Sequence, residues 1–539
     1  MEDRIPSELR AAEQEVDEHY AENPLMKEPF SRAAWHFLAI CEEHSMRHII
    51  HEASNDGEYA AVADNLINHA RWPLRWLISK CSSGGKVPSR CDENLYSAAL
   101  QLSDLALSYG SFAAAFSYAT WGLVTLDLVG SRIKSSGPMI GDVRFEAYDR
   151  LLRNKTAPSA VELVDVSFAQ QVTTSVRVRG DSFDYPLTPK IVQSGIDALT
   201  PAIDCRFALP VEWRFPRFTL EEFRRIARVL WVLAFIHFQA RVAAADLGCE
   251  GLGVSRALLL MEHGEFLRRV RRYSGLPQVT TSAILEILTY GAAGQSNPDP
   301  ALQPLIPLSS SVIAISPTLL LNSSMERNLS VLLNRLPDEK AAYSALSQTK
   351  ETALRQRLIQ ELSCFGFRFW HGQINEWGVA SEIDLAVISD DERRCLVLEL
   401  KAFIGPAEPR ELCERSEEIQ RGINQIRDRM RMAITVPAPL RARLDVNETY
   451  RFSWAVASET SIGAPYVQSP EVPVINTRHL VSRFRRDPML AACCLWLETR
   501  AYLPIEGVHY QTVPMERSVG NWTLEWYGIR PLTDEYILL

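Results

Sequence analysis

Two apolar segments joined by a short acidic turn constrain the fold of this chain most. Residues 383–388 and 395–400 are rich in Val, Ile and Leu, a composition typical of central strands that are covered on both faces. The polar run 389–393, Ser-Asp-Asp-Glu-Arg, separates them. This pattern predicts a β-hairpin at the centre of a sheet in the C-terminal part of the chain.

The predicted hairpin carries three charged residues, with Asp384 on its first strand and Glu399 and Lys401 on its second. Because side chains alternate along a strand, Glu399 and Lys401 share one face while Leu398 and Leu400 fill the other. A buried carboxylate is unfavourable unless it is paired or bound to a metal. Mg²⁺ or Mn²⁺, held by Asp384, Glu399 and the Leu400 carbonyl, would supply that compensation, and Lys401 would orient or deprotonate a water. The alternative is a structural salt bridge between Lys401 and one carboxylate.

These residues and their spacing resemble the PD-(D/E)XK phosphodiesterase superfamily, whose fold is the restriction-endonuclease core. Asp384 matches the motif Asp, and Glu399-Leu400-Lys401 matches the Glu-x-Lys, whereas Ile383 stands where the motif name has Pro. The resemblance covers roughly residues 345–480. It implies an α/β domain, a mixed sheet with flanking helices, that uses a divalent metal ion to hydrolyse phosphodiester bonds.

The resemblance also implies an acid on the helix before the hairpin and a Gln on the helix after it. In the predicted helix 350–362, Glu351 lies near the middle of the leucine stripe and Glu361 nearer its edge. We therefore choose Glu351, with use of neither glutamate as the alternative. On the predicted helix 410–432 we choose Gln425, and an ordinary solvated helix with ion pairs is the alternative.

The charge distribution bears on nucleic-acid binding. A net charge of -9 argues against non-specific coating of nucleic acid over the whole surface. A local basic strip remains compatible with that charge. Arg427 and Arg431 on the long helix, with Arg483 and Arg486 after the last predicted strand, are candidates for phosphate contacts. Simple exposure of these arginines to solvent is the alternative.

Hydrophobic patterning divides the rest of the chain. A length of 539 residues with 47% hydrophobic composition allows more than one core. We predict a mainly α-helical domain over 1–153, a mixed α+β region over 154–340, the nuclease-like domain over 341–505 and a C-terminal β-hairpin extension over 506–539. Within the first of these, helical periodicity covers 111–129. Gly84-Gly85-Lys86 lacks the spacing of a phosphate-binding loop and is not taken as one.

The sequence is typical of a cytoplasmic protein. Met1-Glu2-Asp3-Arg4 is not followed by the apolar segment of a signal peptide. The apolar run 229–236 ends at His237, well short of the roughly 20 residues of a membrane span. The ten cysteines contain no Cys-x-x-Cys pair and suit free thiols in a reducing compartment.

Together these features predict a Mg²⁺-dependent nuclease, with DNA as the expected substrate and restriction of foreign DNA or repair as its role by analogy. The helical N-terminal region would select the substrate, or bind a protein partner or a second copy of the chain. Two alternatives stay open. An RNA nuclease uses the same chemistry, since the reaction takes place at the phosphate and not at the 2′-OH. The other is a nucleic-acid or protein binding scaffold with an inactive nuclease-like domain.

Overall fold

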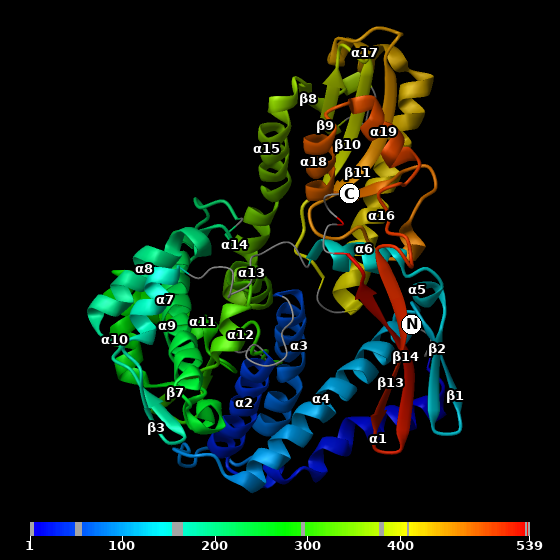
Figure 1. The fold of residues 1–539 in the computed structure, drawn as a ribbon. Coiled ribbons are helices and arrows are strands. Elements are labelled where there is room, and N and C mark those ends of the chain that lie inside the picture. Colours follow the sequence, from blue (N-terminus) through cyan, green and yellow to red (C-terminus); the bar gives the residue numbers. More distant parts are fainter. Residues whose placement is uncertain are drawn as a thin grey trace. The chain divides into compact units, whose positions relative to one another are not determined.

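The computed structural model describes residues 5–48, 56–153, 165–207, 209–292, 297–376, 382–406, 409–533 and 536. The fold is mixed α/β, 57% helical with several small sheets (Figure 1). The chain forms two compact units. Unit 1 comprises 1–14, 111–156 and 347–539, and unit 2 comprises 15–110 and 157–346. Unit 1 therefore combines parts of the predicted helical, nuclease-like and C-terminal segments.

A five-stranded mixed sheet forms the centre of unit 1, in the order β12-β11-β10-β9-β8. Its strands are β8 (Arg368–Gln373), β9 (Glu382–Ser389), β10 (Arg394–Lys401), β11 (Arg451–Ser458) and β12 (Val474–Asn476). Strand β9 runs antiparallel to both of its neighbours, β8 and β10, while β10, β11 and β12 run parallel to one another. The predicted hairpin is confirmed, because β9 pairs with β10 from Ser389↔Arg394 to Leu385↔Leu398.

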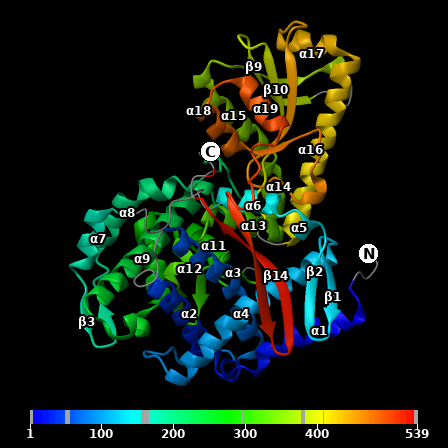
Figure 2. The same ribbon diagram turned by 45° about the vertical axis from the view of Figure 1, so that its right-hand side comes forward.

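Helices cover both faces of this sheet, which explains why residues 385–388 and 395–398 of its central strands are all apolar. Figures 1 and 2 show α16 beside one face and α18 and α19 beside the other. Gly422 of α16 lies against the side chains of Glu399 and Lys401. On the other face, α19 begins where its first backbone N–H groups donate to the Glu392 carboxylate of the β9–β10 turn. The helices are α15 (Lys350–Leu362), α16 (Pro409–Thr435), α17 (Pro437–Leu444), α18 (Thr477–Arg486) and α19 (Leu490–Glu498).

Helix α6 (Arg144–Arg153), far from the sheet in sequence, completes the same core. The Tyr148 hydroxyl accepts a hydrogen bond of 3.1 Å from the Asn476 backbone N–H and lies 3.1 Å from Nδ1 of His479. Asp149 accepts hydrogen bonds from the Ser461 hydroxyl and the Ile462 N–H. A fragment that starts at the predicted boundary of residue 341 would lack this helix and expose the apolar surface that it covers.

A second sheet of unit 1 joins the two ends of the chain, in the order β1-β2-β14-β13. Its strands are β1 (Thr125–Val129), β2 (Arg132–Ser136), β13 (Tyr510–Val519) and β14 (Trp522–Pro531). The predicted C-terminal hairpin is confirmed, and its strand β14 pairs in parallel with β2. The predicted helix over 111–129 is wrong after Thr120, because Gly122 takes a φ of 73° and the next residues pair as a strand.

Unit 2 is mainly helical. Its helices are α2 (Phe30–Arg47), α3 (Asp56–Lys80), α7 (Val166–Thr173), α8 (Pro189–Asp204), α9 (Leu220–Asp246), α10 (His263–Ser274), α11 (Gln278–Leu288), α12 (Pro317–Leu321), α13 (Met325–Arg335) and most of α14 (Pro337–Ser347). Its strands form the pair β3 (Arg177–Arg179) and β4 (Ser182–Asp184) and the sheet β5 (Leu259–Glu262), β7 (Val312–Ile315) and β6 (Leu305–Pro307). Helix α1 (Ser7–Glu18) contains the boundary after residue 14, and helix α4 (Glu93–Thr120) contains the boundary after residue 110. Helix α5 (Pro138–Gly141) belongs to unit 1.

Helix α9 is the buried centre of unit 2. By length and composition it could cross a membrane, and 83% of its most apolar stretch is buried within the protein. Its first turn is fixed by a capping box, in which Thr219 and Glu222 bond to each other's backbone N–H groups. Burial of nearly the whole helix surface explains why an apolar run as long as this one occurs in a folded unit.

Candidate active site at the open end of the β9–β10 hairpin

The backbone brings the two candidate metal ligands to the same end of the hairpin. The pairing of β9 with β10 reaches Leu385↔Leu398, so Asp384 and Glu399 are the next residues on adjacent strands. On its other edge, β9 pairs with β8 at Ala386 and again at Ile383, with a register shift between them. Such a bulge re-aims the side chains that it contains. Oδ2 of Asp384 consequently accepts a hydrogen bond of 2.7 Å from the Leu400 N–H.

The other candidate residues meet around the ammonium group of Lys401. Its Nζ lies 2.6 Å from Oε1 of Glu399, 3.3 Å from Oε1 of Gln425 and 3.9 Å from Oε1 of Glu351. Gln425 comes from α16 and Glu351 from the first turn of α15. Glu361 lies elsewhere, because its carboxylate pairs with Arg485 at 2.8 Å. The structure thus brings together all five side chains predicted to be catalytic.

Sequence reasoning missed one charged residue of this site, Arg429. Its guanidinium is only 6% exposed and forms an ion pair with Oε2 of Glu399. A signal was present, because Arg429 follows Ile419, Ile423 and Ile426 on the apolar face of α16. A metal ion and a salt bridge with Lys401 were the two sources of compensation expected for the buried carboxylate, and Arg429 is a further cation that the sequence did not reveal.

Burial and the neighbouring charges shift the pKa values of the three carboxyl groups of the site. Burial, followed by the nearby Glu399 carboxylate, raises the pKa of Asp384 to about 7. Burial alone would raise the pKa of Glu399 as well, but the Arg429 and Lys401 cations hold it below its usual value. Burial raises the pKa of Glu351, against the opposing effect of Lys401. A further cation nearby would therefore stabilise the ionised forms of Asp384 and Glu351.

The donor set fits a divalent cation that keeps waters and substrate oxygens as further ligands. Among the described residues, Oδ1 of Asp384 has no hydrogen-bond partner, and each oxygen of Glu399 bonds a single cation. The described ranges contain no group of three or more His, Cys, Asp or Glu side chains placed to hold a metal ion. Asp384, Glu399 and the Leu400 carbonyl are the residues that would hold Mg²⁺ or Mn²⁺, with Arg429 competing for Glu399.

The four arginines predicted to contact phosphates do not form one strip. Arg427 and Arg431 lie on α16, and Arg483 and Arg486 lie on α18, which Figures 1 and 2 place on the opposite face of the sheet. Arg427 pairs with Glu471 at 3.4 Å, Arg431 with Asp428 at 2.8 Å and Arg483 with Asp487 at 2.8 Å. The pairs of Arg427 and Arg431 are surface pairs, weak enough for a phosphate to displace the acid, whereas the Arg483 side chain is only 15% exposed. Phosphate contact by these arginines stays a prediction.

Comparisons of the chain with models of protein families, with curated proteins and with solved structures found no match. The functional interpretation of the site therefore depends on its own residues and their geometry.

Proposed function

We propose that unit 1 is a divalent-metal-dependent nuclease with a restriction-endonuclease-like core, and that its substrate is DNA. The observation that supports this most is the meeting of Asp384, Glu399 and Lys401 at the open end of the central hairpin. Glu351 and Gln425 approach the same point from the two flanking helices, as the resemblance implies. Restriction of foreign DNA or repair is the corresponding biological role.

Asp384, Glu399 and the Leu400 carbonyl would hold the metal ion. Bound there, Mg²⁺ would polarise the scissile phosphate and lower the pKa of a coordinated water. Both carboxylates bind more weakly when protonated, so cleavage should rise with pH through the raised pKa of Asp384, near 7.

Lys401 would act at the phosphate, with its ammonium group positioned by Glu399 and Gln425. An ammonium group has three N–H donors, and Glu399 and Gln425 account for two of them. The third is available to a water or to a phosphate oxygen. The Lys401 side chain is 13% exposed, and that of the neighbouring Glu351 is 51% exposed. The charge of Lys401 would stabilise the negative charge that develops in the transition state.

An inert binding scaffold is the second candidate, and one observation favours it. Arg429 and Lys401 together neutralise Glu399 without any metal ion, as in a site that serves only stability. The two candidates differ in metal affinity. In an inert scaffold Arg429 stays paired with Glu399, whereas a nuclease must bind a metal ion at Glu399 in its place.

The test is cleavage of supercoiled plasmid, linear duplex DNA and RNA by the full-length protein, with Mg²⁺, with Mn²⁺ and in EDTA. We expect DNA cleavage that requires metal and that Asp384→Ala and Glu399→Ala each abolish. Glu382→Gln is the matched control, because Glu382 is an exposed carboxylate on the same strand as Asp384. Mn²⁺ binding, measured by electron paramagnetic resonance, should weaken in the two site variants and not in the control.

Each outcome separates the candidates. Cleavage of RNA alone would replace the DNA assignment with an RNA nuclease. Turnover in EDTA would refute the metal mechanism. Absence of cleavage together with absence of Mn²⁺ binding would favour the inert scaffold.

A further inference from the structure

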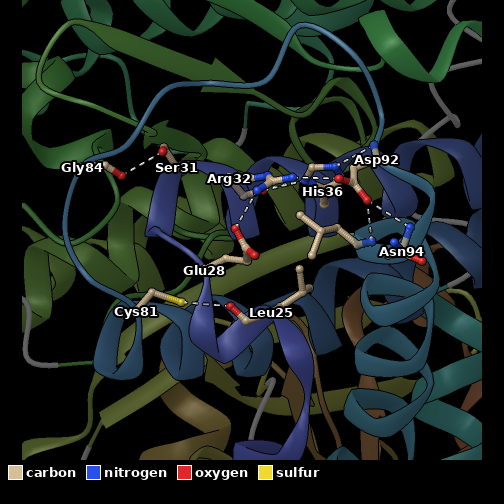
Figure 3. A network of polar contacts seen from close by, with 10 residues as sticks. Leu25, Glu28, Ser31, Arg32, His36, Cys81, Gly84, Asp92 and Asn94 are labelled. Carbon is tan, nitrogen blue, oxygen red and sulfur yellow. Dashed lines mark hydrogen bonds and ion pairs between the residues drawn. The ribbon is translucent and has the colours of Figure 1, made fainter.

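Unit 2 contains a cavity that the proposed nuclease does not use. Its volume is about 530 Å³, and it is lined by Glu28, Pro29, Arg32 and His36 on one side and by residues 86–92 on the other. Small-molecule sites typically have volumes of about 300–1,000 Å³. The lining residues come from the start of α2 and from the loop that leads into α4. Figure 3 shows polar contacts between these two segments.

The loop wall of this cavity is fixed by close backbone contacts. The Phe30 N–H donates to the Ser82 carbonyl at 2.9 Å, and the Ser31 hydroxyl donates to the Gly84 carbonyl at 2.8 Å. Gly85 has a φ of +98°, and a Cβ there would lie 2.6 Å from both Cβ of Pro29 and Oγ of Ser31. Only glycine fits at position 85, so the start of the loop is held against the start of α2.

Arg32 pairs with both acids that line the cavity. Figure 3 shows Arg32 between two carboxylates, with distances of 3.1 Å to Glu28 and 2.7 Å to Asp92. The other oxygen of Asp92 accepts from the Asn94 and Leu95 N–H groups at the start of α4. His36 Nδ1 lies 2.8 Å from the Arg32 carbonyl oxygen, His36 Nε2 accepts from the Asp92 N–H, and burial lowers the pKa of His36.

Two further cations line the cavity without such compensation. Lys86 and Arg90 are exposed, and neither forms an ion pair with any residue in the part of the chain that the structure describes. With Arg32, three cations thus face the two carboxylates of Glu28 and Asp92. The spare positive charge favours an anion. Pro29, Val87 and Pro88 add an apolar wall against which a flat ring can pack.

We propose that this cavity binds a phosphate-bearing small molecule with an attached ring, of the mononucleotide class. Lys86 and Arg90 would contact the phosphates, and the wall of Pro29, Val87 and Pro88 would contact the ring. Gly84-Gly85-Lys86 lacks the spacing of a phosphate-binding loop, and here the side chains of the loop, rather than its backbone N–H groups, supply the charge. The site is separate from the metal site of unit 1.

The test is isothermal titration of the full-length protein with ATP, inorganic phosphate and adenosine, all in EDTA so that no metal ion contributes. ATP should bind with one site per chain, and more tightly than phosphate or adenosine. Lys86→Ala combined with Arg90→Ala should weaken ATP binding by about tenfold or more, since each lost charge-assisted contact costs on that order. The matched control is Lys190→Ala combined with Arg335→Ala, two exposed cations of unit 2 outside the cavity, which should leave ATP binding unchanged.

Two further variants locate the site. Gly85→Ala keeps every charge but displaces the loop, so it should also weaken ATP binding. Asp384→Asn should leave ATP binding unchanged, because Asp384 belongs to unit 1. The proposal is overturned if the wild-type protein binds no ATP, if the Lys86 and Arg90 variant binds ATP as the wild type does, or if Asp384→Asn removes ATP binding. Equal affinity for phosphate and ATP would overturn the ring contact.

Discussion

Replacing Asp384 with Asn should stabilise the metal-free protein at alkaline pH while removing its activity. The pKa of Asp384 rises from 3.8 to about 7 on folding, first through burial and then through Glu399. A carboxyl group with a raised folded pKa contributes its full stability below the unfolded pKa and loses it as the pH rises through the folded pKa. An Asn side chain still accepts from the Leu400 N–H but carries no charge, so the variant avoids this loss.

The expected stability gain of Asp384→Asn follows from the pKa shift of Asp384. About three pKa units at about 1.4 kcal/mol each give an upper bound of about 4 kcal/mol at pH 8. Coupling to Glu399 and the partial exposure of Asp384 reduce this, and we expect Asp384→Asn to gain about 1–2 kcal/mol at pH 8 and close to zero at pH 4. Hydrogen exchange of the segment 382–401 in EDTA measures the opening free energy of the unit that holds the site.

Glu382→Gln removes an exposed carboxylate from the same strand and should change the opening free energy little at either pH. Added Mg²⁺ should stabilise the wild-type protein more than Asp384→Asn, because only the wild type offers both carboxylates. A stability gain in EDTA that is equal at pH 4 and pH 8, or the absence of any gain at pH 8, would refute the electrostatic reasoning.

Three further predictions concern residues around the site and the core beneath it. Lys401→Ala should slow single-turnover cleavage by orders of magnitude and leave the Kd for DNA nearly unchanged, since its charge is used in the transition state. Arg429→Gln should destabilise unit 1 by about 2–3 kcal/mol in EDTA, because a buried carboxylate loses one of its two cations, and should tighten Mn²⁺ binding measured by electron paramagnetic resonance. Tyr148→Ala should cost about 3–5 kcal/mol in the hydrogen exchange of segment 382–401, because Tyr148 is fully buried in the core of unit 1.

Each of these has an outcome that contradicts it. Loss of DNA binding with normal turnover of bound substrate would make Lys401 a phosphate anchor only. Arg431→Gln is the control for Arg429→Gln, because Arg431 lies on the same helix with a side chain that is 70% exposed. If the two variants changed Mn²⁺ binding equally, Arg429 would not compete with the metal ion for Glu399. Normal exchange of segment 382–401 in Tyr148→Ala would show that α6 does not support the sheet.

The sequence by itself determined the elements whose pattern is local. Strands β9 and β10 follow from two apolar runs and the polar turn between them, and the 3.6-residue stripe of leucines places α15 over the residues predicted for it. Strict alternation also places Glu399 and Lys401 on one face. The distance of 2.6 Å between Nζ of Lys401 and Oε1 of Glu399 agrees with this placement. For these elements, a few neighbouring residues contain all of the relevant information.

Only the tertiary structure decided which distant segments meet. Nothing within β2 or β14 indicates that they pair in parallel, and the periodicity of α6 does not show that Tyr148 bonds Asn476. The same holds for Arg429, whose position on an apolar helix face is visible in the sequence but whose partner Glu399 is not. Strand partners and the neutralisation of buried charges are set by three-dimensional proximity, and periodicity along the chain carries no information about it.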